Sequence, residues 1–193
     1  MNFKILLLFT ALSFNLLYIK ASSDTTSKNS FGGGMFYGLG MFKIQNEYIK
    51  TRAQSNVIGG RLGYHFGKNI FAGIIGNSST LNYENQSYIR YTYFGLVTEF
   101  KFPIHKLSIS PGIWIGGGVM KNLHIDGLID HKITDGYLKK HSSWFAYPYL
   151  NASYRATKKL SIHLIAEYIH PAINRSDIKL EGSNIRLGIM FQR

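Results

Sequence analysis

The feature of this sequence that most restricts its fold is a series of segments, each about ten residues long or longer, in which apolar and polar side chains alternate. Such a period of two is typical of a β-strand, whose successive side chains point to opposite faces. The eight segments are residues 33–44, 56–66, 70–81, 88–102, 106–120, 143–156, 160–170 and 183–193. Helical periodicity is weak, while Tyr, Phe, Ile and Gly are abundant. The chain is therefore expected to be all-β.

The connections between these segments alternate between long and short. Short turns lie at Gly67–Asn69, Pro103–His105 and Thr157–Lys159, and the longest connection is residues 121–142. An outer-membrane barrel has short turns at one end and long loops at the other, and an even strand number leaves both chain ends at the short-turn side. A soluble sandwich has no reason to sort its loops by length. The loops therefore favour an eight-stranded, antiparallel, up-and-down transmembrane barrel.

The faces of the segments agree with a barrel, although alternation alone would also serve a soluble sandwich. Residues 88–102 place Phe94 and Leu96 on one side and Glu99 on the other, whereas the faces of 70–81 cannot be assigned. Aromatic residues gather near the segment ends, as the two interfaces of a bilayer select. Those near the short turns are Phe66, Phe102, Tyr154 and Phe191, and those near the long loops are Tyr83, Tyr88, Trp144 and Tyr168.

The N-terminal residues 1–23 have the pattern of a secretory signal peptide. Lys4 precedes an apolar run, and small residues at Ala21 and Ser23 suit cleavage. The remaining residues, 24–193, suit one barrel domain, and the absence of cysteine excludes disulfides as a source of stability. The net charge of +12 could suit nucleic acid. Export makes anionic lipid headgroups the expected partner instead, with no nucleic acid.

The chain resembles the small eight-stranded outer-membrane barrels of the OmpA and OmpX type over nearly all of residues 24–193. The stretches that carry the resemblance are GGGMFYGLGMF, GGRLGYHFGKNIFAG and IRLGIMFQR. It implies location in the bacterial outer membrane and insertion by the barrel assembly machinery, which reads a signal in the last strand. Residues that fit this signal are Arg186, Gly188, Ile189 and Phe191. Many family members end on the aromatic residue, whereas Gln192 and Arg193 follow it here.

The interior is the candidate site, because a barrel of eight strands is only wide enough for side chains to fill. The charged or titratable residues predicted to point inward are Arg61, His65, Glu99, Lys101, Arg155, His163, Glu167 and Arg186. A structural network is the expected role, and a gated ion path is the alternative. If His170 pairs with Ser183, Glu167 lies opposite Arg186, a cross-strand pair that contributes about 0.2–1 kcal/mol.

Two chemical alternatives stay open at the outer rim. His141 and Ser143 have the His-x-Ser spacing that the lipid A deacylase family uses on its membrane-facing wall, and alternate residues share a face. No orienting carboxylate or oxyanion hole can be named for them. A zinc set is the other alternative, although its spacing matches no template. Its members are His124, Asp126, Asp130, His131, Asp135 and His141.

The expectation is thus a non-enzymatic outer-membrane barrel without cofactor or metal, with a role in envelope integrity. Its partners are outer-membrane lipids and lipopolysaccharide, together with a surface partner that residues 121–142 contact through basic side chains. A narrow porin-like channel is the main rival, and a lipid A-modifying enzyme is the third reading.

Overall fold

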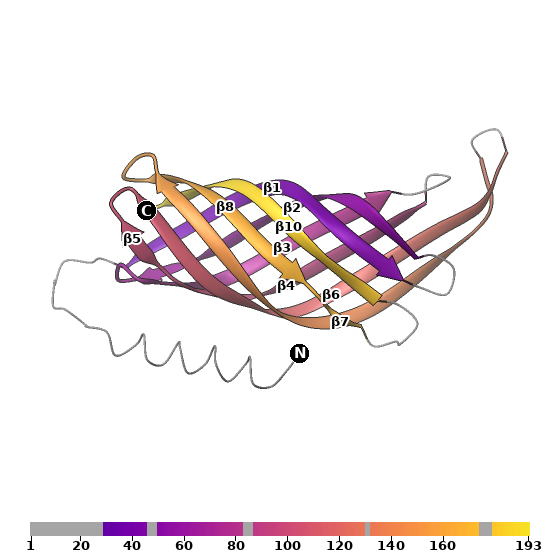
Figure 1. The fold of residues 1–193 in the computed structure, drawn as a ribbon, viewed down its shortest axis with the longest axis horizontal. Helices are drawn as coiled ribbons and strands as arrows, with labels where there is room; N and C mark the ends of the chain where they lie inside the picture. Colours follow the sequence, from indigo (N-terminus) through magenta and orange to yellow (C-terminus); the bar gives the residue numbers. More distant parts are fainter. Residues whose placement is uncertain (1–28, 46–49, 83–86, 130–131, 174–178) are drawn as a thin grey trace.

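A computed structural model describes residues 29–45, 50–82, 87–129, 132–173 and 179–193 of the chain (Figure 1). The expected signal peptide at residues 1–23 lies outside the described residues, as does Tyr83. The strands are β1 (Ser30–Gln45), β2 (Lys50–Phe66), β3 (Ile70–Asn82), β4 (Tyr88–Phe100), β5 (Phe102–Ile104), β6 (Leu107–Ile129), β7 (Lys132–Arg155), β8 (Leu160–Ile169), β9 (Ala172–Ile173) and β10 (Lys179–Gln192). The described residues contain no helix long and apolar enough to cross a membrane.

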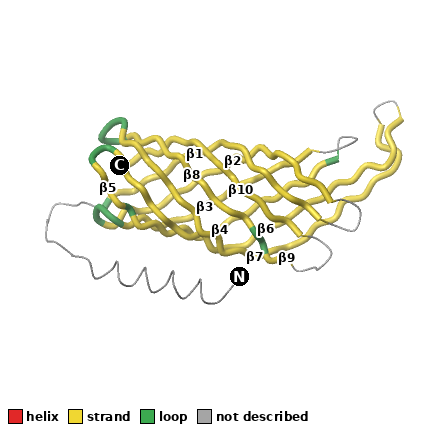
Figure 2. The backbone as a smooth tube through the Cα atoms, in the orientation of Figure 1, coloured by secondary structure: helices red, strands yellow, loops and turns green. Residues whose placement is uncertain are grey.

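The strands form one antiparallel sheet that closes on itself. Around the ring the pairs are β1–β2, β2–β3, β3–β4, β4–β6, β6–β7, β7–β8, β8–β10 and β10–β1 (Figures 1 and 2). The short β5 continues the course of β4 on β6, and β9 continues β8 on β7. Pro171 stands in the β8–β9 interruption, where its missing N–H removes a ladder hydrogen bond. The result is the predicted eight-stranded barrel.

The predicted loop at residues 121–142 is wrong. β6 and β7 stay paired beyond the rest of the barrel, from Leu123 opposite Leu138, where the pairing with β4 ends, to Ile129 opposite Lys132, and they project as a hairpin (Figure 1). The polar composition that suggested a loop is compatible with strands here, because the projecting hairpin lies outside the membrane, where polar side chains can face water. Beyond Leu123, the described strands leave β6 with β7 as its only partner.

The faces predicted for residues 88–102, 106–120, 143–156, 160–170 and 183–193 are confirmed, except that Arg155 at the end of β7 is exposed. Phe94, Leu96 and Ile185 are exposed on the outside, whereas Glu99 and Arg186 are fully buried inside. The predicted aromatic residues that lie exposed on the outer wall are Phe66, Phe102, Tyr154, Phe191, Trp144 and Tyr168. Because exposed apolar and aromatic side chains are stable in contact with lipid, these residues define the part of the outer wall that lies in the membrane, called the membrane belt below.

The polarity of the barrel reverses beyond this belt, towards the long loops. There the outward side chains are polar, such as Gln54, Arg90 and Thr92, and the inward ones include Ile44 and Leu81. This upper part therefore packs like a soluble barrel, with an apolar interior and a wet outside. The reversal explains why the faces of residues 70–81 could not be assigned: β3 crosses the boundary and carries apolar residues on both faces.

The short-turn end holds both ends of the described chain (Figure 1). Gly67 and His105 adopt left-handed conformations with φ of 64° and 58°, which tighten the β2–β3 and β5–β6 turns. Gln192 pairs with Gly32, and the Arg193 amide donates to the Phe31 carbonyl at 2.9 Å. The two residues that follow the terminal aromatic thus extend the closing ladder.

Candidate functional site: the barrel lumen

The first charged cluster in the lumen surrounds Glu99 of β4. Its carboxylate pairs with Arg61 of β2, and both side chains are completely buried. Tyr149 donates to Glu99 Oε1 at 2.8 Å, and Asn151 Nδ2 donates at 3.1 Å. The guanidinium of Arg61 lies over the ring of Phe71, 4.7 Å from its centroid. A buried carboxylate with three donors has most of its hydrogen-bonding capacity satisfied.

His163 of β8 extends this cluster towards the short turns. Its Nδ1 lies 3.1 Å from Asn151 Oδ1, and its Nε2 lies 2.8 Å from the Ser161 hydroxyl. Arg61 Nη2 also lies 3.3 Å from His163 Nδ1. His163 is therefore held in one orientation by polar partners on both sides.

The second charged cluster joins Arg186 of β10 to Glu167 of β8. Arg186 Nη2 lies 3.3 Å from Glu167 Oε2, with both side chains fully buried. Tyr93 and Asn184 donate to Glu167 Oε1 at 3.0 and 2.8 Å. Arg186 also donates to Asn77 of β3. Four strands thus meet at one buried ion pair.

The register predicted for this pair is wrong by two residues. Tyr168, not His170, pairs with Ser183, so Glu167 lies opposite Asn184, and Arg186 lies opposite Ile165. A shift of two residues preserves which side chains face inward, because the strand period is two. Diagonal neighbours remain within reach of long side chains, and the ion pair forms across that diagonal.

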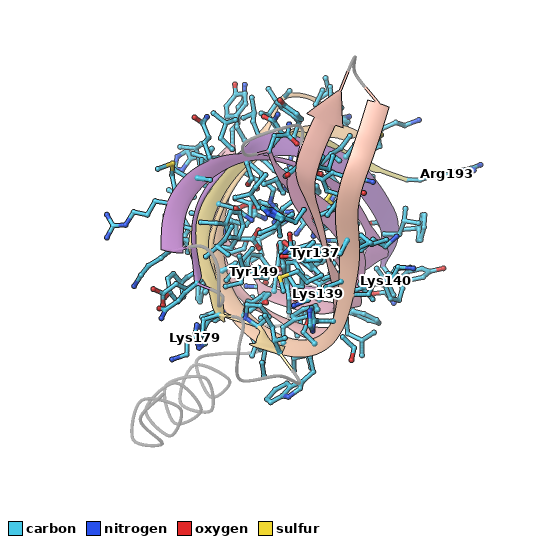
Figure 3. The ribbon with its side chains drawn as sticks, turned by 90° about the vertical axis from the view of Figure 1, so that its right-hand side faces the viewer. Tyr137, Lys139, Lys140, Tyr149, Lys179 and Arg193 are labelled. Atoms are coloured by element: carbon cyan, nitrogen blue, oxygen red, sulfur yellow. The ribbon has the colours of Figure 1, made fainter. Side chains whose placement is uncertain are left out.

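Aromatic rings fill the lumen next to the charged clusters. Trp114 is fully buried, with its ring 4.6 Å from that of Tyr149 and the Arg186 guanidinium 4.5 Å above it. Tyr91 and Tyr147 join their hydroxyls at 3.2 Å. Figure 3, drawn from the long-loop end, shows side chains crowding the ring of strands, with Tyr149 among them. These rings occupy space that an open pore would need.

The upper lumen is lined mainly by apolar side chains, and sequence reasoning did not predict this. It also missed several polar partners of the charged clusters. The inward apolar side chains there are Ile44, Leu81, Ile89, Ile169 and Leu180, each at most 2% exposed. The missed polar partners are Asn77, Tyr93, Tyr149, Asn151 and Asn184. Their positions alternate with those of the lipid-facing residues, which predicts that they point inward. Only the curvature of the barrel shows which of these side chains contact one another.

The remaining predicted lumen residues lie at the short-turn mouth and not in either cluster. His65 Nε2 accepts from Gln192 Nε2 at 2.6 Å. Lys101 is half-buried, while Arg155 is exposed at the end of β7. These three line a hollow of about 380 Å³ at the barrel mouth. The predicted set of eight is therefore divided between two buried ion-pair clusters and a basic mouth.

The lipid-facing chemistry suggested for His141 and Ser143 is wrong, because both side chains are buried on the inner face. The Ser143 hydroxyl lies 3.2 Å from that of Tyr91. A base and a nucleophile that act on lipid A would have to reach the membrane. His141 and Ser143 lie on the strand face that points into the lumen, away from the membrane. Of the suggested zinc set, the side chains at positions 126–135 lie outside the described ones. The described residues hold no group of three or more metal-ligating side chains.

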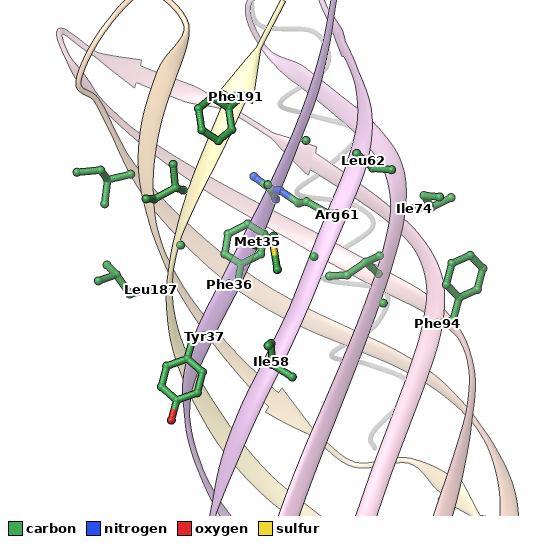
Figure 4. Close-up of a pocket in the computed structure, with 18 residues that line it drawn as sticks. Met35, Phe36, Tyr37, Ile58, Arg61, Leu62, Ile74, Phe94, Leu187 and Phe191 are labelled. Carbon is green, nitrogen blue, oxygen red and sulfur yellow. The ribbon is translucent and has the colours of Figure 1, made fainter.

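A larger hollow of about 1030 Å³ lies on the outer wall, within the belt (Figure 4). Gly60 and Gly76, which pair across β2 and β3, line it together with Leu62, Ile74 and Phe94. Apolar side chains and glycines accommodate lipid tails. This hollow offers no cluster of polar groups for chemistry.

A closed barrel with an apolar belt outside and buried ion pairs inside defines a transmembrane β-barrel. No protein-family model matches the sequence, and no curated protein is detectably similar to it in sequence. Solved structures do share the fold. Neisserial surface protein A has a TM-score of 0.65 at 11% identity, covering 85% of this chain and 98% of that chain.

Two further structures are similar over most of their length. The attachment invasion locus protein Ail of Yersinia pestis has a TM-score of 0.53 at 13% identity, covering 84% of this chain and 98% of that chain. The outer membrane protein OprG of Pseudomonas aeruginosa has a TM-score of 0.51 at 11% identity, covering 86% and 96%. The chain thus has the fold of the small bacterial outer-membrane barrels.

Proposed function

We propose that this protein is an integral outer-membrane barrel, non-enzymatic and without an open channel, that contributes to envelope integrity. The observation that carries the proposal is the filled lumen. Arg61, Trp114 and Arg186 are each at most 2% exposed, and apolar side chains close the upper end. Ion conduction needs a hydrated path, and a packed, paired interior opposes one.

Planar bilayer recordings test the proposal against the porin-like rival. The purified barrel should insert without producing discrete current steps. A membrane protein of known pore size, inserted under the same conditions, checks that the recording would detect a pore. Regular steps that scale with salt concentration would assign the protein a channel function instead.

We further propose that the projecting β6–β7 hairpin contacts a partner outside the cell. The support is its reach beyond the barrel and the basic residues at its base, where Lys121 and Lys140 are exposed opposite each other in the last part of β6 that still pairs with β4. Bacteria that display the full-length chain should adhere to one another or to cultured cells more than bacteria that display a shortened hairpin. Equal adherence, at equal surface amounts, would argue against this role.

We propose that the barrel assembly machinery reads the end of β10. The support is that the signal residues share the pattern of the closing strand: Ile189 and Phe191 lie exposed on the outer wall, and Gly188 and Arg186 face inward. Phe191→Ala should refold in detergent like the natural chain but reach the outer membrane of cells in lower amounts. Ile162→Ala, which changes another exposed belt residue, is the control. Equal cellular amounts of the two variants would remove the special role of Phe191.

A further inference from the structure

The mouth at the short-turn end holds a hollow that the lumen network does not fill. Its volume is about 380 Å³, and it forms where the β2–β3 turn, the β5–β6 turn and the ends of β7, β8 and β10 meet. This volume lies near the lower limit of small-molecule pockets, about 300–1,000 Å³. The hollow therefore suits a small ligand.

The wall of this hollow, called the vestibule below, is positively charged. Its basic side chains are Lys68, Lys101, Lys106, Arg155, His65 and His105, and no Asp or Glu is among the described residues that line it. The four lysine and arginine side chains make no ion pair with any residue that the structure describes. Glu99, two residues before Lys101 in the chain, already pairs with Arg61.

Neutral hydrogen-bond donors converge on the same space. The hydroxyls of Ser108 and Ser153 lie 2.6 Å apart across the β6–β7 ladder, so one donates to the other and the second keeps its proton for a ligand. Ser161 lines the same wall, with its hydroxyl bonded to His163. Lys101 is half-buried without a counter-ion, which costs free energy unless an anion or water offsets its charge. Ammonium, guanidinium and hydroxyl donors around one hollow are the groups that hold oxyanions.

We propose that this vestibule binds a phosphate group, either as free inorganic phosphate or pyrophosphate or as the headgroup of an anionic phospholipid. It lies at the opposite end of the barrel from the β6–β7 hairpin and is independent of the function proposed above. Phosphate fits better than a single carboxylate, because its several oxygens can accept from Lys101, Arg155 and one serine hydroxyl together.

Titration calorimetry with pyrophosphate tests the site in nanodiscs of phosphatidylcholine, at constant chloride. The natural chain should bind with one saturable site. Lys101→Gln combined with Arg155→Gln should weaken binding by about tenfold or more, since two charge-assisted hydrogen bonds are lost. Lys158→Gln combined with Lys159→Gln removes the same charge from exposed positions of the neighbouring β7–β8 turn. This control should change the affinity by less than about twofold.

Absence of saturable binding, or equal losses in the two double variants, would overturn the proposal and leave only diffuse charge attraction. Slower migration of the boiled sample in detergent electrophoresis verifies that each variant is folded. The single variant Arg155→Gln, exposed at the strand end, gives the same comparison if the double variant misfolds. Nanodiscs with phosphatidylglycerol distinguish the two sources. Competition that lowers pyrophosphate affinity there assigns the site to a headgroup, and unchanged affinity assigns it to the free anion.

Discussion

At the scale of single residues, the lumen depends on charges that are buried but paired. Glu167 has donors from Tyr93 and Asn184 besides its contact with Arg186. A buried pair can be close to neutral as a whole, whereas the loss of one partner leaves an uncompensated charge. The residues therefore matter more as a set than as separate contributions.

The first prediction concerns this set. Arg186→Met should lower the free energy of unfolding by about 3–5 kcal/mol, because the Glu167 charge would stay buried without its partner. Combining it with Glu167→Gln should recover part of the loss. Urea unfolding of the barrel in lipid vesicles, followed by tryptophan fluorescence, measures the coupling. Additive losses in the double variant would show that the two groups do not interact.

The rim ion pair supplies the control for that measurement. Lys43 donates to Glu181 Oε1 at 2.9 Å above the membrane belt, where water screens it. The hydrogen bond from Lys43, and then its charge, lower the pKa of the Glu181 carboxyl. Any stability it contributes is therefore present at neutral pH and lost as the pH falls through the lowered pKa. Glu181→Gln should leave urea resistance at neutral pH nearly unchanged.

Gly188 carries a second prediction. A Cβ at this position would lie 2.2 Å from the ring of Phe36 and 2.4 Å from the Met35 carbonyl oxygen, so the wall would have to shift. Gly188→Ala should destabilise the barrel by about 1–3 kcal/mol. Gly76→Ala is the matched control, because its Cβ would meet Phe94 at 3.7 Å, an ordinary contact on the outer wall. Urea midpoints that are equal for the two variants would contradict this prediction.

At the scale of elements, one pair of described strands, β6 and β7, continues beyond the closed ring. The β6–β7 ladder begins inside the ring and continues past the point where β4 and β9 end as neighbours. Its register shifts between Ile125 and Gly127, a bulge that changes local twist. The projecting part shares no ladder with the rest of the barrel among the described strands.

The hairpin prediction follows from that separation. Replacing residues 124–137 with an Asn-Gly turn keeps Leu123 opposite Leu138 and closes a two-residue hairpin. The shortened barrel should fold and resist detergent like the natural chain. Heat-dependent migration in detergent electrophoresis, with circular dichroism, checks this. Failure to fold would mean that the hairpin stabilises the ring.

At the scale of the whole molecule, one closed sheet crosses from the lipid of the membrane belt into the water above it. The membrane belt is apolar outside and polar inside, and the upper part is polar outside and apolar inside. Closure pairs every strand of the ring on both sides, which a bilayer requires because it offers no water to unpaired backbone groups. The filled lumen then explains why no pore is expected.

Opening the lumen should therefore create a leak. Trp114→Ala removes the largest fully buried side chain and should produce current steps in planar bilayers that the natural chain lacks. Trp144→Ala deletes the same kind of side chain from the lipid-facing wall, where it is 61% exposed. This variant should produce no current steps. If both variants are folded and neither produces current steps, the neighbouring rings fill the space that the Trp114 side chain leaves, and the prediction is wrong.

The sequence by itself determined the strand number, the inward and outward faces and the charged nature of the interior, because each depends on a period of two along the chain. Only the tertiary structure decided the register of β8 on β10, the hairpin at 121–142 and the partners of Glu99. Register and curvature depend on contacts between distant strands, and a shift of two residues leaves the sequence pattern unchanged. The reversal of polarity along β3 likewise became visible only when the belt located the membrane.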